Sequence, residues 1–287
     1  MIKFHEDMEL FREAMNFTAA ETAFAARLIE KDYFCSVLLE HLAAVTGGQL
    51  VFKGGTCLAK VHAEFYRLSE DLDFVLPMPV DAPRSERSRR AVALKEAVAA
   101  LPRALPCFRV VEPLLGANES TQYTGSVGYT SALSRQEETI NIEISLREPL
   151  LTPTVIGAAR TILLDPVSGA PLVPPMPVRC ISKTEAIAEK FRAALTRPEI
   201  AIRDFYDLDY VAREHEVRTE DAELITLVRR KLAVPGNEPI NMGPDRMPEL
   251  RRQLEARLKP VLRERDFSEF DLDRAYKMAA EMAKAVT

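Results

Sequence analysis

The chain has few cysteines and lacks the short motifs that identify several common classes of protein. Its four cysteines, Cys35, Cys57, Cys107 and Cys180, are widely scattered, and none belongs to a CxxC pair. Zinc ribbons and disulfide frameworks need characteristic cysteine spacings, so neither is indicated and buried free thiols are expected. The sequence also contains no P-loop and no HRD or DFG motif, which weakens the case for a kinase.

Long apolar runs and an excess of positive charge are missing as well. No apolar run is long enough to span a bilayer, and the first residues are polar and acidic, unlike a signal peptide. A cytoplasmic protein that does not enter a membrane is therefore expected. The net charge of -5 argues against a dedicated, non-specific nucleic-acid binder, although clustered Arg and Lys residues can still form a local positive face.

The most informative stretch is residues 51–76, which read VFKGGTCLAKVHAEFYRLSEDLDFVL. An apolar run ends at Gly54-Gly55-Thr56, where two glycines allow a sharp turn and the close approach of a ligand. The N–H groups of Thr56 and Cys57 would then open a helix and suit a phosphate. The pattern predicts a strand, a phosphate-binding turn, a helix and a second strand. Taken alone, a Gly-Gly pair ahead of a helix is common and carries no function.

The second strand of this stretch carries two carboxylates, Asp71 and Asp73. They lie two residues apart, so both side chains point to the same face of a strand. Neighbouring carboxylates repel each other, so both stay ionised only when water hydrates them or a divalent cation binds them. The pair therefore predicts either a metal site or a solvated acidic surface.

A third carboxylate lies on a later predicted strand, Thr139–Leu146. Alternation places Ile140, Ile142 and Ile144 on one face and Glu143 on the other. If this strand lies beside the strand of Asp71 and Asp73, Glu143 joins the same metal site. The alternative is an ordinary solvent-facing residue.

Basic residues occur near these acids in two groups. Lys60 and Arg67 are the nearest cations; each is expected either to contact a phosphate or to pair with Glu64 or Glu70, and we assign Lys60 to the nucleotide-binding set. A denser cluster follows at Arg84, Arg87, Arg89 and Arg90. It indicates a solvated helix face, with a contact surface for a polyanion as the alternative.

The order of patterns along the chain indicates two lobes. Residues 1–150 combine helical and strand-like segments, so this half is expected to be α/β (α+β) with a small mixed sheet. Residues 151–180 contain six prolines and are predicted to be a linker. Residues 181–287 show helical spacing throughout, beginning with a capping box in which Ser182 is the cap and Glu185 lies three residues on.

One segment of the first half combines charge with helical spacing. In EKDYFCSVLLEHLAAV, Asp32 is a candidate N-cap of a helix whose apolar face includes Phe34 and Leu38. Residues Glu30, Lys31 and Asp32 are equally consistent with a solvated charge run.

Taken together, these segments resemble a known family. KGGTCLAKV, RLSEDLDF, INIEISLRE, EAIAEKFRAAL and RDFYDLDYV, preceded by EKDY, are similar to the AbiEii/AbiGii toxin family of nucleotidyltransferases, which includes the mycobacterial MenT toxins. The similarity runs from about Glu30 to Val211 with the segments in the same order. It implies a DNA polymerase β-like nucleotidyltransferase lobe followed by the helical lobe.

The resemblance also implies roles for individual residues. Gly54, Gly55 and Thr56 would lie on the triphosphate, and Asp71 and Asp73 would hold Mg²⁺ (or Mn²⁺). In the second half, Lys190 and Asp204 are implied to be catalytic or nucleotide-binding, with Asp207 as the second candidate for the acid; a structural ion pair is the alternative. Ser69 matches a serine that an antitoxin kinase can phosphorylate in the family. One departure is the gap between Gly55 and Asp71, which exceeds the usual superfamily spacing.

The function expected from the resemblance is that of a nucleotidyltransferase toxin of a toxin–antitoxin system. It would transfer NMP from an NTP to an acceptor, the 3′ end of tRNA by analogy with the MenT toxins, with an antitoxin as partner. Two other functions stay open. One is a nucleotidyltransferase that modifies a protein or a small molecule, and the other is a non-catalytic nucleotide- or partner-binding module of the same fold.

Overall fold

The computed structural model describes residues 2–147 and 149–287 and divides the chain into two compact units. Unit 1 comprises Met1–Leu150 and Thr154–Ile181, and unit 2 comprises Leu151–Pro153 and Ser182–Thr287. No helix within these described ranges has the length and hydropathy that crossing a bilayer requires. The four cysteines are free thiols.

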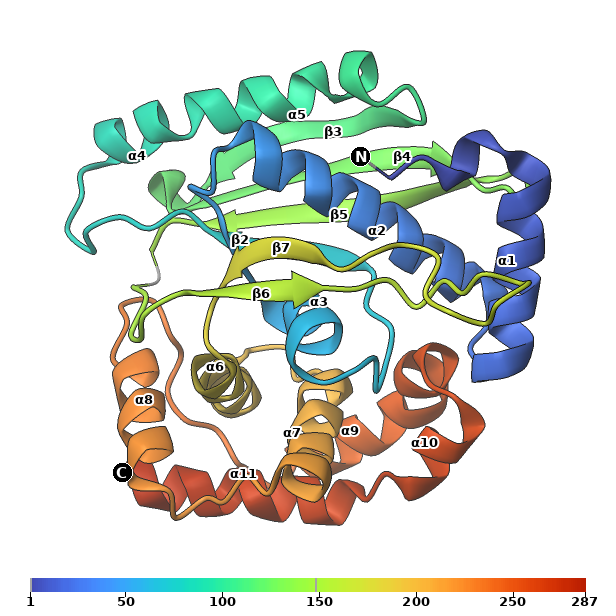
Figure 1. The fold of residues 1–287 in the computed structure, drawn as a ribbon. Helices are drawn as coiled ribbons and strands as arrows, with labels where there is room; N and C mark the ends of the chain where they lie inside the picture. The colour runs from blue at the N-terminus through green and yellow to red at the C-terminus, as the bar shows by residue number, and fades with distance from the viewer. Residues whose placement is uncertain (1, 148) are drawn as a thin grey trace. The chain divides into compact units, whose positions relative to one another are not determined.

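Unit 1 is built on one mixed sheet, which contains seven strands within the described residues (Figure 1). The strand order is β3-β4-β5-β2-β1-β7-β6, and β2 runs parallel to β5 and antiparallel to β1. The strands are β1 (Val51–Lys53), β2 (Asp71–Val75), β3 (Phe108–Ala117), β4 (Gln122–Thr130), β5 (Glu137–Ser145), β6 (Val155–Ala159) and β7 (Met176–Cys180). The predicted mixed α/β class is confirmed.

Two of these strands come from the segment that the sequence predicts to be a linker. Strands β6 and β7 form an antiparallel pair, and β7 also pairs in parallel with β1 at Phe52 and Cys180. Residues 154–181 therefore belong to unit 1 and extend its sheet. Pro177 is tolerated in β7 because β1 is short, and the register between β7 and β1 reaches only Cys180.

Helices α2 and α5 pack against this sheet, α2 across its middle and α5 along β3 (Figure 1). The helical elements of unit 1 are η1 (Phe4–Glu6), α1 (Met8–Thr22), α2 (Ala26–Val45), α3 (Gly54–Cys57), a π-helical turn η2 (Leu58–His62), α4 (Arg84–Arg90), α5 (Val92–Ala104) and η3 (Asn118–Ser120). The aromatic part of the core lies under α2, where the rings of Phe34 and Tyr129 stack with centroids 4.0 Å apart.

The charged run of α2 is buried, so the expectation of a solvated run is wrong. The Glu30 carboxylate accepts hydrogen bonds from Ser131 Oγ at 2.7 Å and from the Ala132 N–H at 2.6 Å. Asp32 is not an N-cap, because α2 begins at Ala26 and continues through Asp32. Its carboxylate instead forms a buried ion pair with Lys60. These charges are satisfied inside the unit by partners from distant segments.

Unit 2 is helical throughout its described elements, which confirms the predicted all-α second half. Its helices are α6 (Lys183–Thr196), α7 (Ile202–His215), α8 (Ala222–Leu232), α9 (Arg246–Gln253), the π-helical turn η4 (Leu254–Leu258), η5 (Lys259–Val261), α10 (Glu264–Glu269) and α11 (Leu272–Val286). Ser182 caps α6 as predicted, its Oγ accepting from the Glu185 N–H at 3.2 Å. The Glu185 side chain forms a buried ion pair with Lys231 at 2.7 Å and accepts from the backbone N–H groups of Leu151 and Thr152.

Candidate active site

The glycine turn after β1 brings the backbone against a carboxylate. Gly54 has φ +77°, a left-handed conformation that glycine adopts without strain. A Cβ atom at this position would lie 2.1 Å from Asp73 Oδ2, so a larger residue would displace the carboxylate. At Gly55 a Cβ atom would lie 2.3 Å from Nη2 of Arg67. The turn therefore requires glycine at Gly54, whereas at Gly55 the flexible end of the Arg67 side chain fills the space.

Thr56 fixes the turn to the acidic strand. Its side chain is buried, and its Oγ1 donates a hydrogen bond to the carbonyl oxygen of Asp71. The start of α3 is therefore tied to the start of β2. The three residues of the predicted phosphate turn lie together beside the acid pair.

The carboxylates of β2 and β5 face the same side of the sheet. Asp71 and Asp73 are partly exposed while Leu72 and Phe74 between and after them are buried, as the alternation predicts. In the parallel register, Asp73 lies opposite Glu143 and Asp71 lies opposite Asn141. Asn141 Nδ2 donates to Asp71 Oδ1 at 2.8 Å. The strand of Glu143 therefore lies beside the strand of Asp71 and Asp73, which was the condition for Glu143 to join their site.

The donors present at this edge of the sheet fit a hard divalent cation. Asp71, Asp73 and Glu143 offer only carboxylate oxygens, which are the ligands that Mg²⁺ and Mn²⁺ prefer. Among the residues that the structure describes, Asp71 and Glu143 form no ion pair with a basic side chain. The glycine backbone at Gly54 leaves the Asp73 carboxylate room beside it. Lys53 of β1 lies opposite Asp73, and the carboxylates of Asp71 and Glu143 beside it add negative charge that suits a bound cation.

The two cations of the stretch have different positions from those expected. Lys60 is buried, and its Nζ contacts the Asp32 carboxylate, the Ser36 hydroxyl at 2.7 Å and the Asp32 carbonyl at 3.0 Å. Its ammonium group therefore belongs to the interior of unit 1, and Lys60 is left out of the set proposed below. Arg67 is also buried, with its guanidinium against Gly55.

The acids expected as alternative partners of these cations pair elsewhere. Glu70 lies 3.3 Å from Lys31 Nζ, and Glu64 lies 3.3 Å from Arg160. Ser69 is partly exposed in the segment just before β2, two residues ahead of Asp71.

The candidate residues of unit 2 form one ion-pair network between α6 and α7. Lys190 Nζ lies 3.0 Å from Asp204 Oδ1 and 2.7 Å from Asp207 Oδ2. Asp204 is also paired with Arg197, at 3.0 Å. The side chain of Asp207 is fully buried and that of Lys190 is 13% exposed. Both candidate acids thus contact the predicted lysine.

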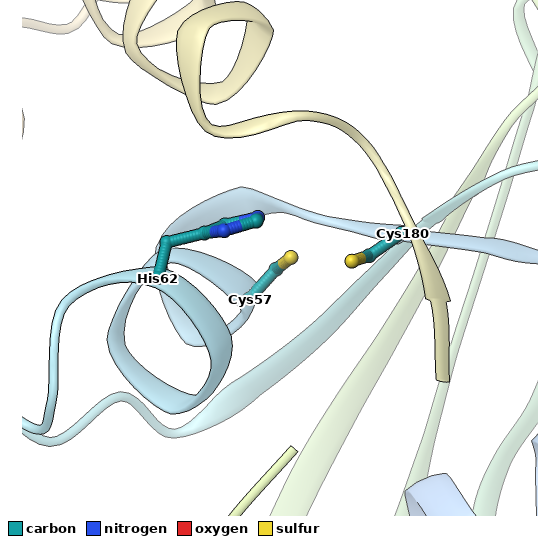
Figure 2. Close-up of side chains that lie close together, drawn as sticks. All are labelled: Cys57, His62 and Cys180. Carbon is teal, nitrogen blue, oxygen red and sulfur yellow. The ribbon is translucent and has the colours of Figure 1, made fainter. Parts of the chain in front are cut away.

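A further group of side chains was not expected from the sequence. Cys57, His62 and Cys180 converge, with their potential ligand atoms all within 4.8 Å of one another (Figure 2). The hydrogen bond with Cys57 holds the pKa of the Cys180 thiol well below its usual range, and His62 acts in the same direction against the effect of burial. Cys180 is far from Cys57 and His62 in the chain, and five positions do not share a face of an α-helix, so spacing gave no signal.

The fold and the acidic edge of its sheet define a class of protein. A mixed sheet with a glycine turn after one strand and paired carboxylates on the next is the arrangement expected of a nucleotidyltransferase. The family described as "Nucleotidyl transferase AbiEii toxin, Type IV TA system" matches residues 37–282. The chain belongs to this family, and it is an enzyme of the nucleotidyltransferase class.

Two solved structures are similar to this chain at low sequence identity, and the first of them shows its fold. JHP933 of Helicobacter pylori is 16% identical with a TM-score of 0.54, over 92% of this chain and 93% of that chain. The nucleotidyltransferase toxin MenT4 of Mycobacterium tuberculosis is 18% identical with a TM-score of 0.48, over 95% of this chain and 97% of that chain. A comparison with curated proteins gave no match.

Proposed function

We propose that this toxin transfers a nucleoside monophosphate from an NTP to a hydroxyl group at the 3′ end of tRNA and releases pyrophosphate. The observation that carries the proposal is the register of β2 and β5, which sets Glu143 opposite Asp73 and beside Asp71. Nucleotidyl transfer concentrates negative charge on the phosphoryl oxygens, so it needs a site that gathers cations and positions the triphosphate. The acidic edge of unit 1 is suited to the first task and the glycine turn to the second.

The residues of unit 1 have separate tasks in this proposal. Asp71, Asp73 and Glu143 would hold Mg²⁺ (or Mn²⁺), which supplies positive charge to the triphosphate. Gly54 and Gly55 let the turn pack against the Asp73 carboxylate and the Arg67 guanidinium, and Thr56 holds this turn against β2 through its bond to Asp71. The N–H groups of the turn would bind phosphate oxygens. The guanidinium of Arg67, packed at Gly55, adds fixed positive charge behind the turn.

In unit 2 we assign nucleotide binding to Lys190. Its ammonium would neutralise phosphate charge, and Asp204 and Asp207 hold it from two sides at 3.0 and 2.7 Å. Two carboxylates around one lysine keep the ammonium charged and fix its direction. The competing role is a structural ion pair, which stabilises unit 2 without contacting the nucleotide.

The family supports the proposed acceptor, partner and compartment. The MenT toxins, which the family includes, argue for tRNA as acceptor, and the exposed arginines Arg84, Arg89 and Arg90 offer positive charge for an RNA backbone. A cognate antitoxin is the expected protein partner. We propose that an antitoxin kinase phosphorylates this chain at Ser69. The activity is placed in the cytoplasm because NTPs and tRNA are found there.

The test is incubation with each α-labelled NTP and total RNA, using the full chain and its Asp73→Asn variant. We expect label in tRNA with the wild type and none with Asp73→Asn. Asp273→Asn, a change at an exposed acid of α11, is the matched control and should label normally. Label in protein instead would redirect the proposal to protein modification. No label with any NTP would favour a non-catalytic binding module.

A further inference from the structure

Three side chains with soft or nitrogen donors meet in unit 1 away from the carboxylates of the proposed active site. Cys57 is the last residue of α3, His62 ends the π-helical turn η2, and Cys180 ends β7 (Figure 2). Their potential ligand atoms lie within 4.8 Å of one another. Both cysteines are free, and both are fully buried.

The π-helical turn explains how Cys57 and His62 reach the same side of one helical segment. The two residues are five positions apart, and in an α-helix with 3.6 residues per turn such positions do not share a face. In a π-helical turn the hydrogen bonds join residues i and i+5, so residue i+5 is stacked on residue i. Residues Leu58–His62 form such a turn. π-Helical turns are rare, and they often occur at functional sites.

The orientation of His62 is that of a metal ligand. Its Nε2 lies 3.0 Å from the carbonyl oxygen of Ile181, the residue after Cys180. A carbonyl oxygen only accepts hydrogen bonds, so Nε2 donates here and Nδ1 is the nitrogen left for a metal. Histidine ligands of metals almost always donate their second N–H group to a carbonyl or carboxylate in this way.

The surrounding backbone leaves room for the group. A Cβ atom at Gly157 of β6 would lie 3.0 Å from Cys180 Sγ and 2.3 Å from a methyl carbon of Val61. Glycine at this position therefore allows the π-helical turn to approach β6 and β7 closely. His62 is partly exposed, which provides a route for an ion and a place for a water ligand.

We propose that Cys57, His62 and Cys180 bind one thiophilic metal ion of the Zn²⁺ type, with water as the fourth ligand. Two thiolates and an imidazole are the preferred donors of Zn²⁺. A tetrahedral site with Zn–S of about 2.3 Å and Zn–N of about 2.0 Å separates its ligand atoms by about 3.6–3.8 Å. The ligand atoms observed here lie within 4.8 Å of one another, so metal binding would draw them together by about 1 Å. Binding breaks the two S–H bonds and releases their protons to solvent.

The competing chemistry is a disulfide between Cys57 and Cys180. A disulfide needs an external two-electron oxidant and leaves the orientation of His62 without a role. The metal uses all three residues. It would also clamp α3, which begins at the glycine turn, to β7 at the other side of β1.

The experiment is a titration of the reduced full-length chain with Co²⁺, followed by displacement with Zn²⁺. We expect a thiolate-to-cobalt charge-transfer band that saturates at one equivalent and disappears when Zn²⁺ is added. Cys180→Ala and His62→Gln should each weaken Co²⁺ binding at least about tenfold. Cys107→Ala, at a half-buried thiol outside the group, is the control and should bind as the wild type does.

The outcomes separate cleanly and do not depend on transferase activity. The proposal is overturned if the reduced wild type gives no band, or if the band survives in both His62→Gln and Cys180→Ala. It is overturned as well if Cys107→Ala loses the band. Should Cys180→Ala fail to fold, the wild-type titration and the partly exposed His62 position still decide the question. A native Cys57–Cys180 disulfide by intact mass, with no cobalt uptake after reduction, assigns the pair to redox chemistry instead.

Discussion

Two acid pairs, one in each unit, lie in opposite electrostatic surroundings. On β2, Asp71 and Asp73 are partly exposed, and their in-register neighbours on β5 are Asn141 and Glu143. On α7, Asp204 and Asp207 are buried, and both contact the ammonium group of Lys190. On β2, Asp71 has an amide partner in Asn141, and Lys53 of β1 lies opposite Asp73. The α7 acids are instead neutralised by a lysine of their own unit.

The difference indicates that the α7 acids stabilise the fold and that the β2 acids serve the proposed catalysis. A carboxylate can be buried when an ion pair offsets the free-energy cost of its desolvation, as Lys190 does for the α7 pair. A set of neighbouring carboxylates is instead retained at a cost in stability when a bound cation or a substrate needs it. Substitutions in the two pairs should therefore have opposite effects on activity and stability.

The largest effect is expected at β2. Asp71→Asn should lower the rate of NMP transfer by at least about a hundredfold, because the charge that holds the cation is lost. The same change should leave the urea midpoint of unfolding unchanged or raise it, since repulsion with the neighbouring acids is relieved. Initial rates with labelled NTP and equilibrium urea unfolding test this. An active Asp71→Asn, or a destabilised one, would remove the contrast between the pairs.

The next effect is expected at α7 and has the opposite balance. Lys190→Met removes the ammonium group from the buried Asp207 and leaves Asp204 with Arg197, so it should destabilise the fold by about 3–5 kcal/mol. Adding Asp207→Asn should recover part of that loss. Lys284→Met, at an exposed position of α11, is the control and should change stability little. Urea unfolding measures these differences.

NTP binding by Lys190→Met separates the two roles of Lys190. Measured under conditions where the variant is folded, the affinity for NTP should fall if the ammonium contacts phosphate. Unchanged affinity for NTP together with lower stability would show that Lys190 has only a structural role in unit 2.

Two buried glutamates should give the units opposite responses to acid. Burial alone raises the pKa of Glu185, but the ion pair with Lys231 outweighs it, so the pKa lies below its ordinary value. Its contribution to stability is present above the unfolded value of 4.5 and is lost as the pH falls through the folded pKa. Burial raises the pKa of Glu30 in unit 1, so its ionised form opposes folding and protonation relieves this as the pH falls through the raised pKa.

Hydrogen exchange followed by peptide mass spectrometry measures both units between pH 7 and pH 3. Glu185→Gln should lower protection of unit 2 at pH 7 and flatten its loss in acid. Glu30→Gln should preserve or raise protection of unit 1 at pH 7. Protection that falls in parallel in the two units, and that neither variant alters, would contradict these assignments.

The smallest effect is expected at Ser69. Ser69→Asp adds a negative charge two residues from Asp71 in a partly exposed segment, and charge–charge energies in such surroundings are about 1 kcal/mol. Transfer should therefore fall about fivefold, while Ser69→Ala should retain its rate. Equal rates in both variants would argue against regulation of the acid pair through this serine.

The shared face of Asp71, Asp73 and Glu143, the centre of the proposed active site, could be predicted from the sequence because its signals are local. Alternation alone put Asp71 and Asp73 on one face, and the isoleucines of β5 placed Glu143 on the opposite face from the core. Their meeting in register depended only on β2 and β5 being neighbours. The all-α character of unit 2 followed from helical spacing in the same way.

The predictions that failed depended on partners distant in sequence. Nothing near Asp32 or Lys60 indicates that they bury their charges against each other. Prolines suggested a linker at 151–180, yet the segment contributes two strands, and Pro177 is accommodated in β7 where the neighbouring β1 is short. Cys57, His62 and Cys180 come together only through a π-helical turn and a strand pairing.

The most direct test of the central claim is the transfer of label from α-labelled NTP to RNA by the wild type and Asp73→Asn. The account predicts labelled tRNA with the wild type, none with Asp73→Asn, and undiminished labelling with Asp273→Asn. Labelling by Asp73→Asn at the wild-type rate would contradict the assignment of the acidic edge of unit 1 as the catalytic site.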